Sequence, residues 1–261
     1  MMKPPKIDRS TPSIGVCLTP TLIDQFELKN SIVVALDVLR ATTTMCTAFD
    51  HGARSMIPVA TLEEARAYQA QGFLAAAERN GEHIKGFDFG NSPFSYMNKR
   101  IKGKDICIST TNGTLAIKAA LDHGAEEILV GSFANLSRLA DYLLEQKKNV
   151  VMLCAGWKER PNLEDTIFAG AMVKRLRPEF HRLQDSALIA ETLFRNANRR
   201  KRFFIRNSSH FNRLYHILQI QKDVKYALRP DTHPVLPKLY GDRLYDMDGP
   251  YVKELALDLQ R

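Results

Sequence analysis

The sequence has few cysteines and lacks any run of apolar residues long enough to cross a membrane. Its four cysteines are widely spaced among 261 residues, without the CxxC pairs typical of zinc sites and redox motifs. Nothing approaches the roughly 18 consecutive apolar residues that a membrane span requires. Residues 1–12 carry basic side chains but no apolar segment behind them, which is typical of a loose tail rather than a signal peptide. These absences predict a cytoplasmic chain with reduced thiols and no membrane partner.

Positive charge is concentrated in one part of the chain. The net charge is +8, and residues 174–229 hold fourteen lysines and arginines against four acidic residues. Three interpretations fit this basic segment: a nucleic-acid-binding surface, a solvated helical face, or a wall that faces an anionic substrate. The overall composition, 44% hydrophobic and 25% charged, is that of an ordinary globular protein.

Apolar runs of strand length alternate with helical segments over the first 175 residues. Ser31–Leu36 (SIVVAL) is typical of a strand buried on both faces, and residues 42–51 after it predict a helix that ends at Gly52. Further strands are predicted at 55–59, 73–77, 106–109, 128–130 and 150–153, and helices at 61–71, 114–123, 135–146 and 163–176. The alternation predicts an α/β fold, with a mostly parallel sheet flanked by helices.

A short internal repeat suggests duplication. The sequence DHGA at residues 50–53 recurs at 122–125, inside matching strand, threonine-rich turn and helix patterns. We therefore expect a duplicated βαβ-like element. We predict three regions: residues 1–30 as tail and first strand region, 31–178 as the α/β core, and 179–261 as a smaller C-terminal α/β subdomain packed on the core. In that subdomain we expect helices at 183–197 and 209–219, a strand at 223–227 and a weak helix in the tail.

The first polar segment follows the apolar strand at residues 31–36. Asp37 could hold a metal ion and Arg40 could bind an anion through its planar guanidinium. Thr42 and Thr43 open the next helix, where backbone amides and hydroxyl groups form an anion site. The alternative interpretation is a capped helix start with a salt-bridged Asp37–Arg40 pair.

A second strand, turn and helix repeats this arrangement at residues 106–123. Thr111, Asn112 and Thr114 provide polar donors, and Gly113 would let the backbone approach a phosphate closely. The GxxxxGK[ST] spacing of a P-loop is absent. An ordinary Asn-Gly turn is the alternative.

Two further segments complete the predicted site. Glu78 and Arg79 open a long glycine-rich loop that contains Asn91 and Ser92, and loops of this length are often functional. The fourth segment follows the predicted strand at 150–153 and contains Cys154, Glu164 and Asp165. Glu164 and Asp165 fall in the first turn of a helix, where acids are also favoured by the helix dipole. Cys154 is interpreted as a packing residue rather than a nucleophile.

Several of these motifs occur in one order that resembles the 2-phosphosulfolactate phosphatase family. They are ALDVLRATTT, ERNG, GFDFGNSP, STTNGT, LCAGW and LEDTIFAGA, between residues 31 and 173. The resemblance resumes more weakly at residues 208–214 and 223–228. Residues 158–161 depart from the family's sequence pattern. The resemblance implies magnesium-dependent removal of phosphate from 2-phospho-3-sulfolactate, a step of coenzyme M biosynthesis in methanogens.

Together the motifs and the resemblance predict roles for individual residues. The predicted catalytic residues are Asp37, Arg40 and Asn112. The predicted substrate-binding residues are Thr42, Thr43, Arg79, Asn91, Ser92, Thr111 and Thr114. The predicted Mg²⁺ ligands are Asp37, Glu78, Glu164 and Asp165. A metal-activated water is favoured as the nucleophile over direct attack by Asp37.

The expected partner is a small phosphate ester. Two alternatives stay open: a phosphatase for another small phospho-acid or sugar phosphate, and a nucleic-acid-binding module built on residues 174–229. Nucleic acid is the less favoured partner because the polar motifs gather at strand ends, away from the basic segment. Assembly into a homo-oligomer is left open.

Overall fold

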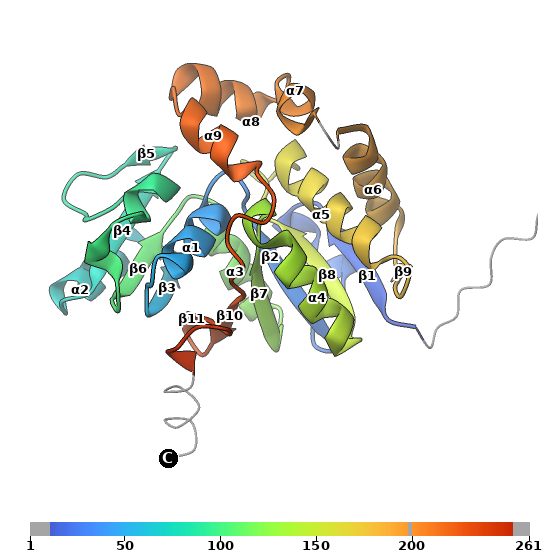
Figure 1. The fold of residues 1–261 in the computed structure, drawn as a ribbon, viewed down its shortest axis with the longest axis horizontal. Coiled ribbons are helices and arrows are strands. Elements are labelled where there is room, and N and C mark those ends of the chain that lie inside the picture. The colour runs from blue at the N-terminus through green and yellow to red at the C-terminus, as the bar shows by residue number, and fades with distance from the viewer. Residues whose placement is uncertain (1–10, 198–199, 253–261) are drawn as a thin grey trace, which may run out of the picture.

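The computed structural model describes residues 11–197 and 200–252, in which strands and helices alternate as far as α5 (Figure 1). The strands are β1 (Ser13–Cys17), β2 (Ser31–Leu36), β3 (Ser55–Val59), β4 (Leu74–Arg79), β5 (Glu82–His83), β6 (Asp105–Ser109), β7 (Glu127–Gly131), β8 (Asn149–Cys154), β9 (His181–Arg182), β10 (Pro237–Tyr240) and β11 (Arg243–Asp246). The helices are α1 (Ala41–Asp50), α2 (Leu62–Ala70), α3 (Gly113–Asp122), α4 (Leu136–Gln146), α5 (Leu163–Leu176), α6 (Asp185–Ala197), α7 (Lys201–Ile205), α8 (Ser209–Asn212) and α9 (Gln221–Ala227).

The strands form one sheet in the order β5-β4-β6-β3-β11-β10-β7-β2-β8-β1-β9. Parallel pairing joins β4, β6 and β3 into one half, and β7, β2, β8 and β1 into the other. The antiparallel hairpin β10–β11 lies between the halves, where Lys238 pairs with β7 and Leu244 pairs with β3. The predicted α/β fold with a mostly parallel sheet is confirmed. Strands from both sides of the predicted boundary at residue 178 belong to this one sheet.

Two units of the chain repeat, as the DHGA echo predicts. The bounds of α1 and β3 correspond to those of α3 and β7 at a constant offset of 72 residues. After each helix, a histidine Nδ1 contacts the carbonyl oxygen four residues earlier, at 3.0 Å for His51 and 2.8 Å for His123. Gly52 and Gly124 follow with φ of 91° and 78°, a conformation that glycine adopts without steric cost.

The sheet is buried on both faces by helices. On one face of β1, β2 and β8, helices α4, α5 and α6 pack around Leu139, Phe168 and Met172. On the other face, α1 and α3 contribute Met45 and Ile117 to a second core, while α2 covers β3, β4 and β6. All six residues of β2 are buried, which explains its continuous apolar composition. Within the described ranges, no helix has the length and hydropathy that crossing a bilayer requires.

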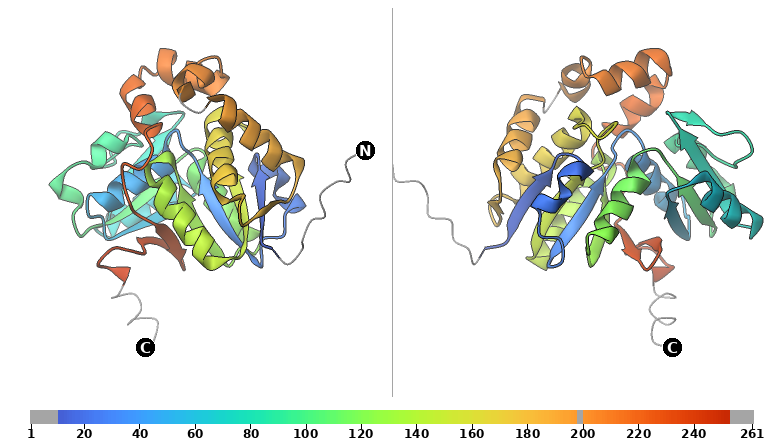
Figure 2. Two further views of the ribbon diagram at one scale, coloured as in Figure 1. Left: turned by 45° about the vertical axis from the view of Figure 1, so that its right-hand side comes forward. Right: turned by 180° about the vertical axis from the view of Figure 1, so that it is seen from behind.

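The short helices α7, α8 and α9 form a cap above the carboxyl ends of the central strands (Figures 1 and 2). The helix predicted at 183–197 is confirmed as α6, and 209–219 contains α8 and a π-helical turn, Arg213–Ile217. The strand predicted at 223–227 is wrong, because these residues lie in α9. Val224 and Ala227 are both buried, and this spacing of three residues fits one side of a helix. The weak helix predicted for the C-terminal tail is wrong for the residues of β10 and β11, which pair as a hairpin with the sheet, and residues 253–261 lie outside the described part.

Candidate active site

The carboxyl ends of β2, β4, β6 and β8 bring the four predicted polar segments together beneath the cap. This is the edge of a parallel sheet where ligands bind in open α/β proteins. A small cavity of about 50 Å³ lies here between strand ends and cap. Its lining comprises Arg40, Glu78, Asn80, Gly81, Thr111, Asn112, Trp157, Lys158, His210, Arg213 and Leu214.

The turn from β2 into α1 is held by its own threonines. The amide of Asp37 donates to Oγ1 of Thr42 at 3.1 Å, and the amide of Thr42 donates to the carbonyl oxygen of Asp37 at 2.9 Å. The hydroxyl of Thr43 donates to the carbonyl oxygen of Val38 at 2.9 Å. All three predicted site residues are buried. These bonds fix the backbone of the turn that carries Asp37, and contact of the threonines with substrate stays a prediction.

The equivalent turn from β6 into α3 approaches the first turn closely. The hydroxyl of Thr114 donates to the carbonyl oxygen of Thr110 at 3.1 Å, and the amide of Thr114 donates to the Thr110 hydroxyl at 3.2 Å. A Cβ atom on Gly113 would lie 2.5 Å from Cβ of Ala41 and 2.9 Å from Oδ2 of Asp37. Only glycine fits here, because the starts of α1 and α3 meet around the Asp37 carboxylate.

Glu78 connects two of the other predicted residues, Thr111 and Asn91, with the glycine-rich loop. Its Oε1 accepts hydrogen bonds from the amide of Gly81 at 2.5 Å and from the hydroxyl of Thr111 at 2.8 Å. Its Oε2 accepts from Nδ2 of Asn91 at 3.4 Å. The carboxylate therefore holds the glycine-rich loop against the end of β6. Its predicted role as a metal ligand stays a prediction.

Arg79 points away from this group. Its guanidinium donates to the carbonyl oxygens of Glu78 at 2.7 Å and Ala60 at 3.1 Å, and to the Ser109 hydroxyl at 2.9 Å. Arg79 thereby ties the end of β4 to the ends of β3 and β6. Binding of substrate by Arg79 would require it to leave these contacts.

Arg40 links the strand ends to the cap. Its Nη1 donates to Oδ2 of Asp223 in α9, and its Nη2 donates to the carbonyl oxygen of Gly81, both at 2.7 Å. The hydroxyl of Ser92 donates to the other Asp223 oxygen at 3.1 Å. Arg40 and Ser92 also line a second cavity, of about 400 Å³. The ion-pair partner of Arg40 in the structure is thus Asp223 rather than Asp37.

The two acids at the start of α5 are fully buried and differ in their partners. Asp165 accepts hydrogen bonds from the amide of Val38 and from Nδ2 of Asn162, both at 2.8 Å. Glu164 pairs through Oε1 with Nδ1 of His210 in α8. The Oε2 atom of Glu164 is buried and has no hydrogen-bond partner among the described residues.

Burial and mutual repulsion perturb the acids of this site. Burial raises the pKa of Asp37 to about 6; the nearby charges of Glu78 and Glu164 add to the rise and His210 opposes it. Burial, followed by the charges of Glu164 and Asp37, holds the pKa of Asp165 well above its usual range. Burial alone would lower the pKa of His210, but its pairing with Glu164 raises that pKa overall. Such perturbed groups in a cleft mark functional sites.

The carboxylates fit a magnesium ion chemically. Magnesium prefers oxygen ligands, keeps several waters, and is usually held by one or two carboxylates together with substrate phosphate. Glu164 offers an unpartnered buried oxygen, and burial, with the charges of Glu78 and Glu164, raises the pKa of Asp37, so a cation beside it would be favoured. No group of three or more histidine, cysteine, aspartate or glutamate side chains forms a metal cluster in the described ranges. An ion here would therefore rest on one or two protein carboxylates.

The cap and the loop after β8 supply residues that received no role in the sequence interpretation. The ring of Trp157 stacks on His210, with centroids 5.5 Å apart and planes 15° apart. The guanidinium carbon of Arg213 lies 5.7 Å from the Trp157 ring centroid, and Arg213 also donates to the carbonyl oxygen of Asn80. With Asp223, these residues lie in or beside segments 153–157, 208–214 and 223–228, where the family resemblance is present. That resemblance was the signal that could have found them.

Two other sequence interpretations concern Cys154 and the basic segment 174–229. The expectation that this segment lies away from the polar motifs is wrong, because it contains the cap, and Arg213 lines the small cavity. Cys154 is fully buried at the end of β8, and burial raises the pKa of its thiol well above the usual value, which opposes thiolate formation. Within the basic segment, Arg177, Arg182 and Arg195 surround Glu191 at N–O distances of 3.5, 2.8 and 2.5 Å. Part of the basic segment is therefore neutralised within the fold.

Comparison with known proteins identifies the family. The family model for 2-phosphosulpholactate phosphatase matches residues 17–242. The chain belongs to the 2-phosphosulpholactate phosphatase family. It is 42% identical over 206 residues to a protein of Thermotoga petrophila named probable 2-phosphosulfolactate phosphatase, covering 79% of this chain and 88% of the relative. Proteins of the same name from Caldanaerobacter subterraneus and Clostridium acetobutylicum are 34% and 32% identical, covering 83% and 86% of this chain and 91% and 96% of the relatives.

Membership of the 2-phosphosulpholactate phosphatase family makes the chain a phosphoric monoester hydrolase. The matched region runs from the end of β1 to the β10–β11 hairpin, so it includes the cap as well as the strand ends. The resemblance predicted from the motifs is thus confirmed, and it extends over residues where the sequence motifs were weak.

Proposed function

We propose that the chain hydrolyses a small, highly anionic phosphate monoester with the help of Mg²⁺, and that its substrate is 2-phospho-3-sulfolactate. The products would be 3-sulfolactate and phosphate, which would give the enzyme a place in coenzyme M biosynthesis. The observation that carries the proposal is the meeting of Asp37, Glu164 and Arg40 at the starts of α1, α3 and α5. Arg40, Glu78 and His210 line the small cavity there, and the buried carboxylates of Asp37 and Glu164 lie close to Glu78 and His210 without being part of the lining.

Arg40 and Arg213 supply positive charge to the phosphoryl oxygens in this proposal, and both line the small cavity. Phosphoryl transfer depends mainly on positioning and on stabilisation of charge at these oxygens. The Asn112 side chain and the start of α3 add neutral donors on the opposite side. Magnesium held by Asp37 and Glu164 would supply further positive charge and lower the pKa of the attacking water.

His210 is the residue that we assign to the departing oxygen. Its Nδ1 is held by Glu164, which leaves Nε2 as the ring nitrogen able to donate a proton. In hydrolysis, the water oxygen bonds to phosphorus, the ester P–O bond breaks, and the departing oxygen takes the proton from Nε2. A proton released by the attacking water restores the ring. The stacked Trp157 fixes the plane of the imidazole.

The setting of this reaction would be the cytoplasm. All four cysteines are buried free thiols, which fits a reducing compartment.

The direct test is phosphate release from a panel of small esters, measured with added Mg²⁺ and after thorough chelation with EDTA. The panel contains 2-phospho-3-sulfolactate, phospholactate, glycerol phosphate and a sugar phosphate. We expect the highest kcat/KM for 2-phospho-3-sulfolactate, and activity that EDTA abolishes and Mg²⁺ restores. Preference for a sugar phosphate would refute the substrate, and full activity after chelation would refute the metal.

A further inference from the structure

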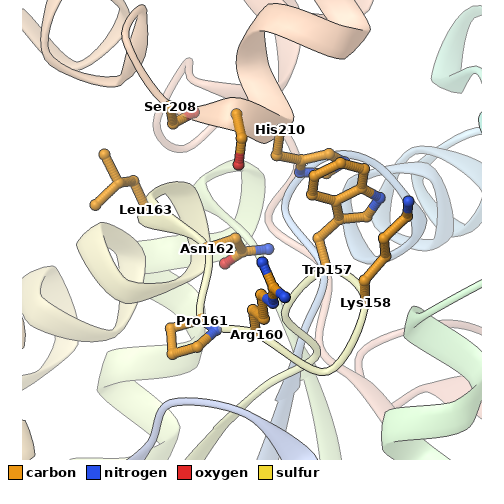
Figure 3. A pocket seen from close by; sticks show the side chains of 9 residues that line it. Trp157, Lys158, Arg160, Pro161, Asn162, Leu163, Ser208 and His210 are labelled. Carbon is orange, nitrogen blue, oxygen red and sulfur yellow. The ribbon is translucent and has the colours of Figure 1, made fainter.

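A larger cavity adjoins the small one on the β8 side of the site. It has a volume of about 540 Å³ and shares Trp157, Lys158 and His210 with the small cavity. Figure 3 shows Arg160 and Asn162 beneath the Trp157–His210 stack, with Ser208 on the cap side. The small cavity, about 50 Å³, has room for one compact group. The organic part of a phosphate ester held there must therefore extend beyond it, and this larger cavity adjoins it, as does the cavity of about 400 Å³ beside Arg40.

A tight turn directs two cations into this larger cavity. Trp157 and Arg160 pair through both backbone groups, with N–O distances of 2.8 and 3.1 Å. Lys158 and Glu159 between them have φ of 52° and 59°, where residues with a Cβ atom are disfavoured by roughly 1–2 kcal/mol each. Neither residue is the glycine or asparagine that such turns prefer. Backbone strain of this kind is commonly retained where it positions functional side chains.

The charge of the turn is positive and open to a ligand. Within residues 11–197 and 200–252, neither Lys158 nor Arg160 forms an ion pair. Lys158 Nζ lies 5.1 Å from the centroid of the Trp157 ring, and Arg213 approaches the same ring at 5.7 Å. Glu159 is the acid of the turn. Three cations against this one acid leave a net attraction for anions around the tryptophan.

We propose that this cavity binds a second anionic group of the substrate, with Lys158 and Arg160 as its counter-charges and Trp157 as its wall. The group is an oxyanion, either carboxylate or sulfonate, on the organic part of the ester. Lys158 and Arg160 are then the residues that select esters with a second anion over neutral esters. This proposal rests on the proposed phosphatase function of the adjoining small cavity.

The first test measures binding without catalysis. Trp157 is the single tryptophan of the chain and lines both cavities, so its fluorescence reports on the larger cavity once the small cavity is held in one state. With saturating inorganic phosphate to occupy the small cavity, the full chain is titrated with malonate, sulfoacetate and ethanedisulfonate. We expect saturable fluorescence changes, and a Kd raised roughly 10- to 100-fold in Lys158→Gln and Arg160→Gln, as for loss of a charged hydrogen bond. The strongest of the three ligands identifies the preferred oxyanion.

Lys148→Gln is the matched control, because Lys148 lies at the start of β8, at the opposite edge of the sheet. It should leave every Kd unchanged. Absence of a saturable signal in the wild-type chain, or equal affinity in the wild type and both turn variants, would overturn the proposal.

The second test compares esters. Arg160→Gln should raise KM for phospholactate and 2-phospho-3-sulfolactate roughly 10-fold or more, and change kcat/KM for glycerol phosphate by less than about threefold. Equal losses on all three esters would make Arg160 structural and refute its role in selection. If the wild type hydrolyses none of the esters, the phosphatase proposal fails. If the wild type hydrolyses the esters, but the turn variants lose the same activity on esters with and without a second anion, only the second-anion proposal fails.

Discussion

Arg40→Ala is the most informative single substitution, because Arg40 contacts both the strand ends and the cap. The guanidinium forms a buried ion pair with Asp223, in which the two side chains are 6% and 7% exposed. It also donates to the carbonyl oxygen of Gly81 and lines the small cavity. The substitution therefore removes an ion-pair partner, a hydrogen-bond donor to the loop and a proposed phosphate contact at once.

The expected loss has two parts. Removing one partner of a buried ion pair costs about 3–5 kcal/mol, because the other charge is left buried without compensation. At about 2–4 °C per kcal/mol for a chain of this size, the melting temperature should fall by roughly 6–20 °C. Loss of a preorganised donor to transition-state charge should lower kcat/KM by about 10²–10³. Catalysis and stability should both decline.

A second variant separates these two parts. In the double substitution Arg40→Ala with Asp223→Asn, no unpaired carboxylate is left buried, so part of the melting temperature should return while activity stays low. The control is Arg138→Ala, which breaks the bidentate surface pair with Asp248. That pair is worth about 0–1 kcal/mol, and its loss should leave kcat/KM unchanged. The assays are steady-state kinetics on one phosphate ester and thermal melts. If Arg40→Ala melts early but keeps kcat/KM within about threefold, Arg40 is structural and its assignment to phosphate is refuted.

Three further outcomes follow from the site. Cys154→Ser should keep activity within about threefold, since the buried thiol is far from its thiolate form; a loss of several orders of magnitude in a folded variant would make Cys154 the nucleophile. Because the pKa values of Asp37 and Asp165 are raised in the fold, the chelated protein should lose stability as pH rises from about 4 through about 6 and beyond. Mg²⁺ binds the ionised carboxylates, so it should raise the melting temperature more at about pH 8 than at about pH 5. Equal Mg²⁺ effects at both pH values would refute this linkage. Gly113→Ala should destabilise by about 1–3 kcal/mol and reduce activity, because its methyl would overlap Ala41 beside Asp37; an unchanged melting temperature would contradict the close approach.

The strand-end segments were predictable because local sequence determines them. A continuous apolar run predicts a buried strand wherever it stands, and Gly52 marks the end of the helix after it. The observed α1 (Ala41–Asp50) differs by one residue at each end from the predicted helix at 42–51. Parallel strands end at one edge of the sheet, so residues that follow several strands, such as Asp37 and Glu78, were expected to gather there.

The cap was not predictable in the same way. Arg40 and Asp223 are separated by 183 residues, and nothing in the local sequence says which of many acids Arg40 meets. The nearest acid, Asp37, was the natural alternative, yet its carboxylate faces the start of α3. The mistaken strand at 223–227 has a similar cause. Val224 and Tyr226 favour a strand locally, whereas packing of the cap places these residues in a helix.

The duplicated element places Asp37 and Arg40 in only one of two equivalent turns. The chain leaves β2 through α1 to reach β3 in the other half of the sheet, and it returns from β6 through α3 to β7. The two helix starts therefore meet between the halves. At the repeat offset of 72 residues, Asp37 and Arg40 of the first copy correspond to Ser109 and Asn112 of the second.

One copy thus carries the carboxylate and the guanidinium, and the other carries neutral donors at matching positions. A site with charge in both copies would place two carboxylates across the contact at Gly113, and like charges at such a distance repel strongly when buried. Neutral residues in the second copy avoid that repulsion, and Asn112 lines the small cavity, where it would be a neutral donor in the proposed function. In the proposed function, this divergence would keep a further carboxylate away from Asp37, where Glu78 and Glu164 already raise its pKa, and would leave neutral donors beside the phosphate.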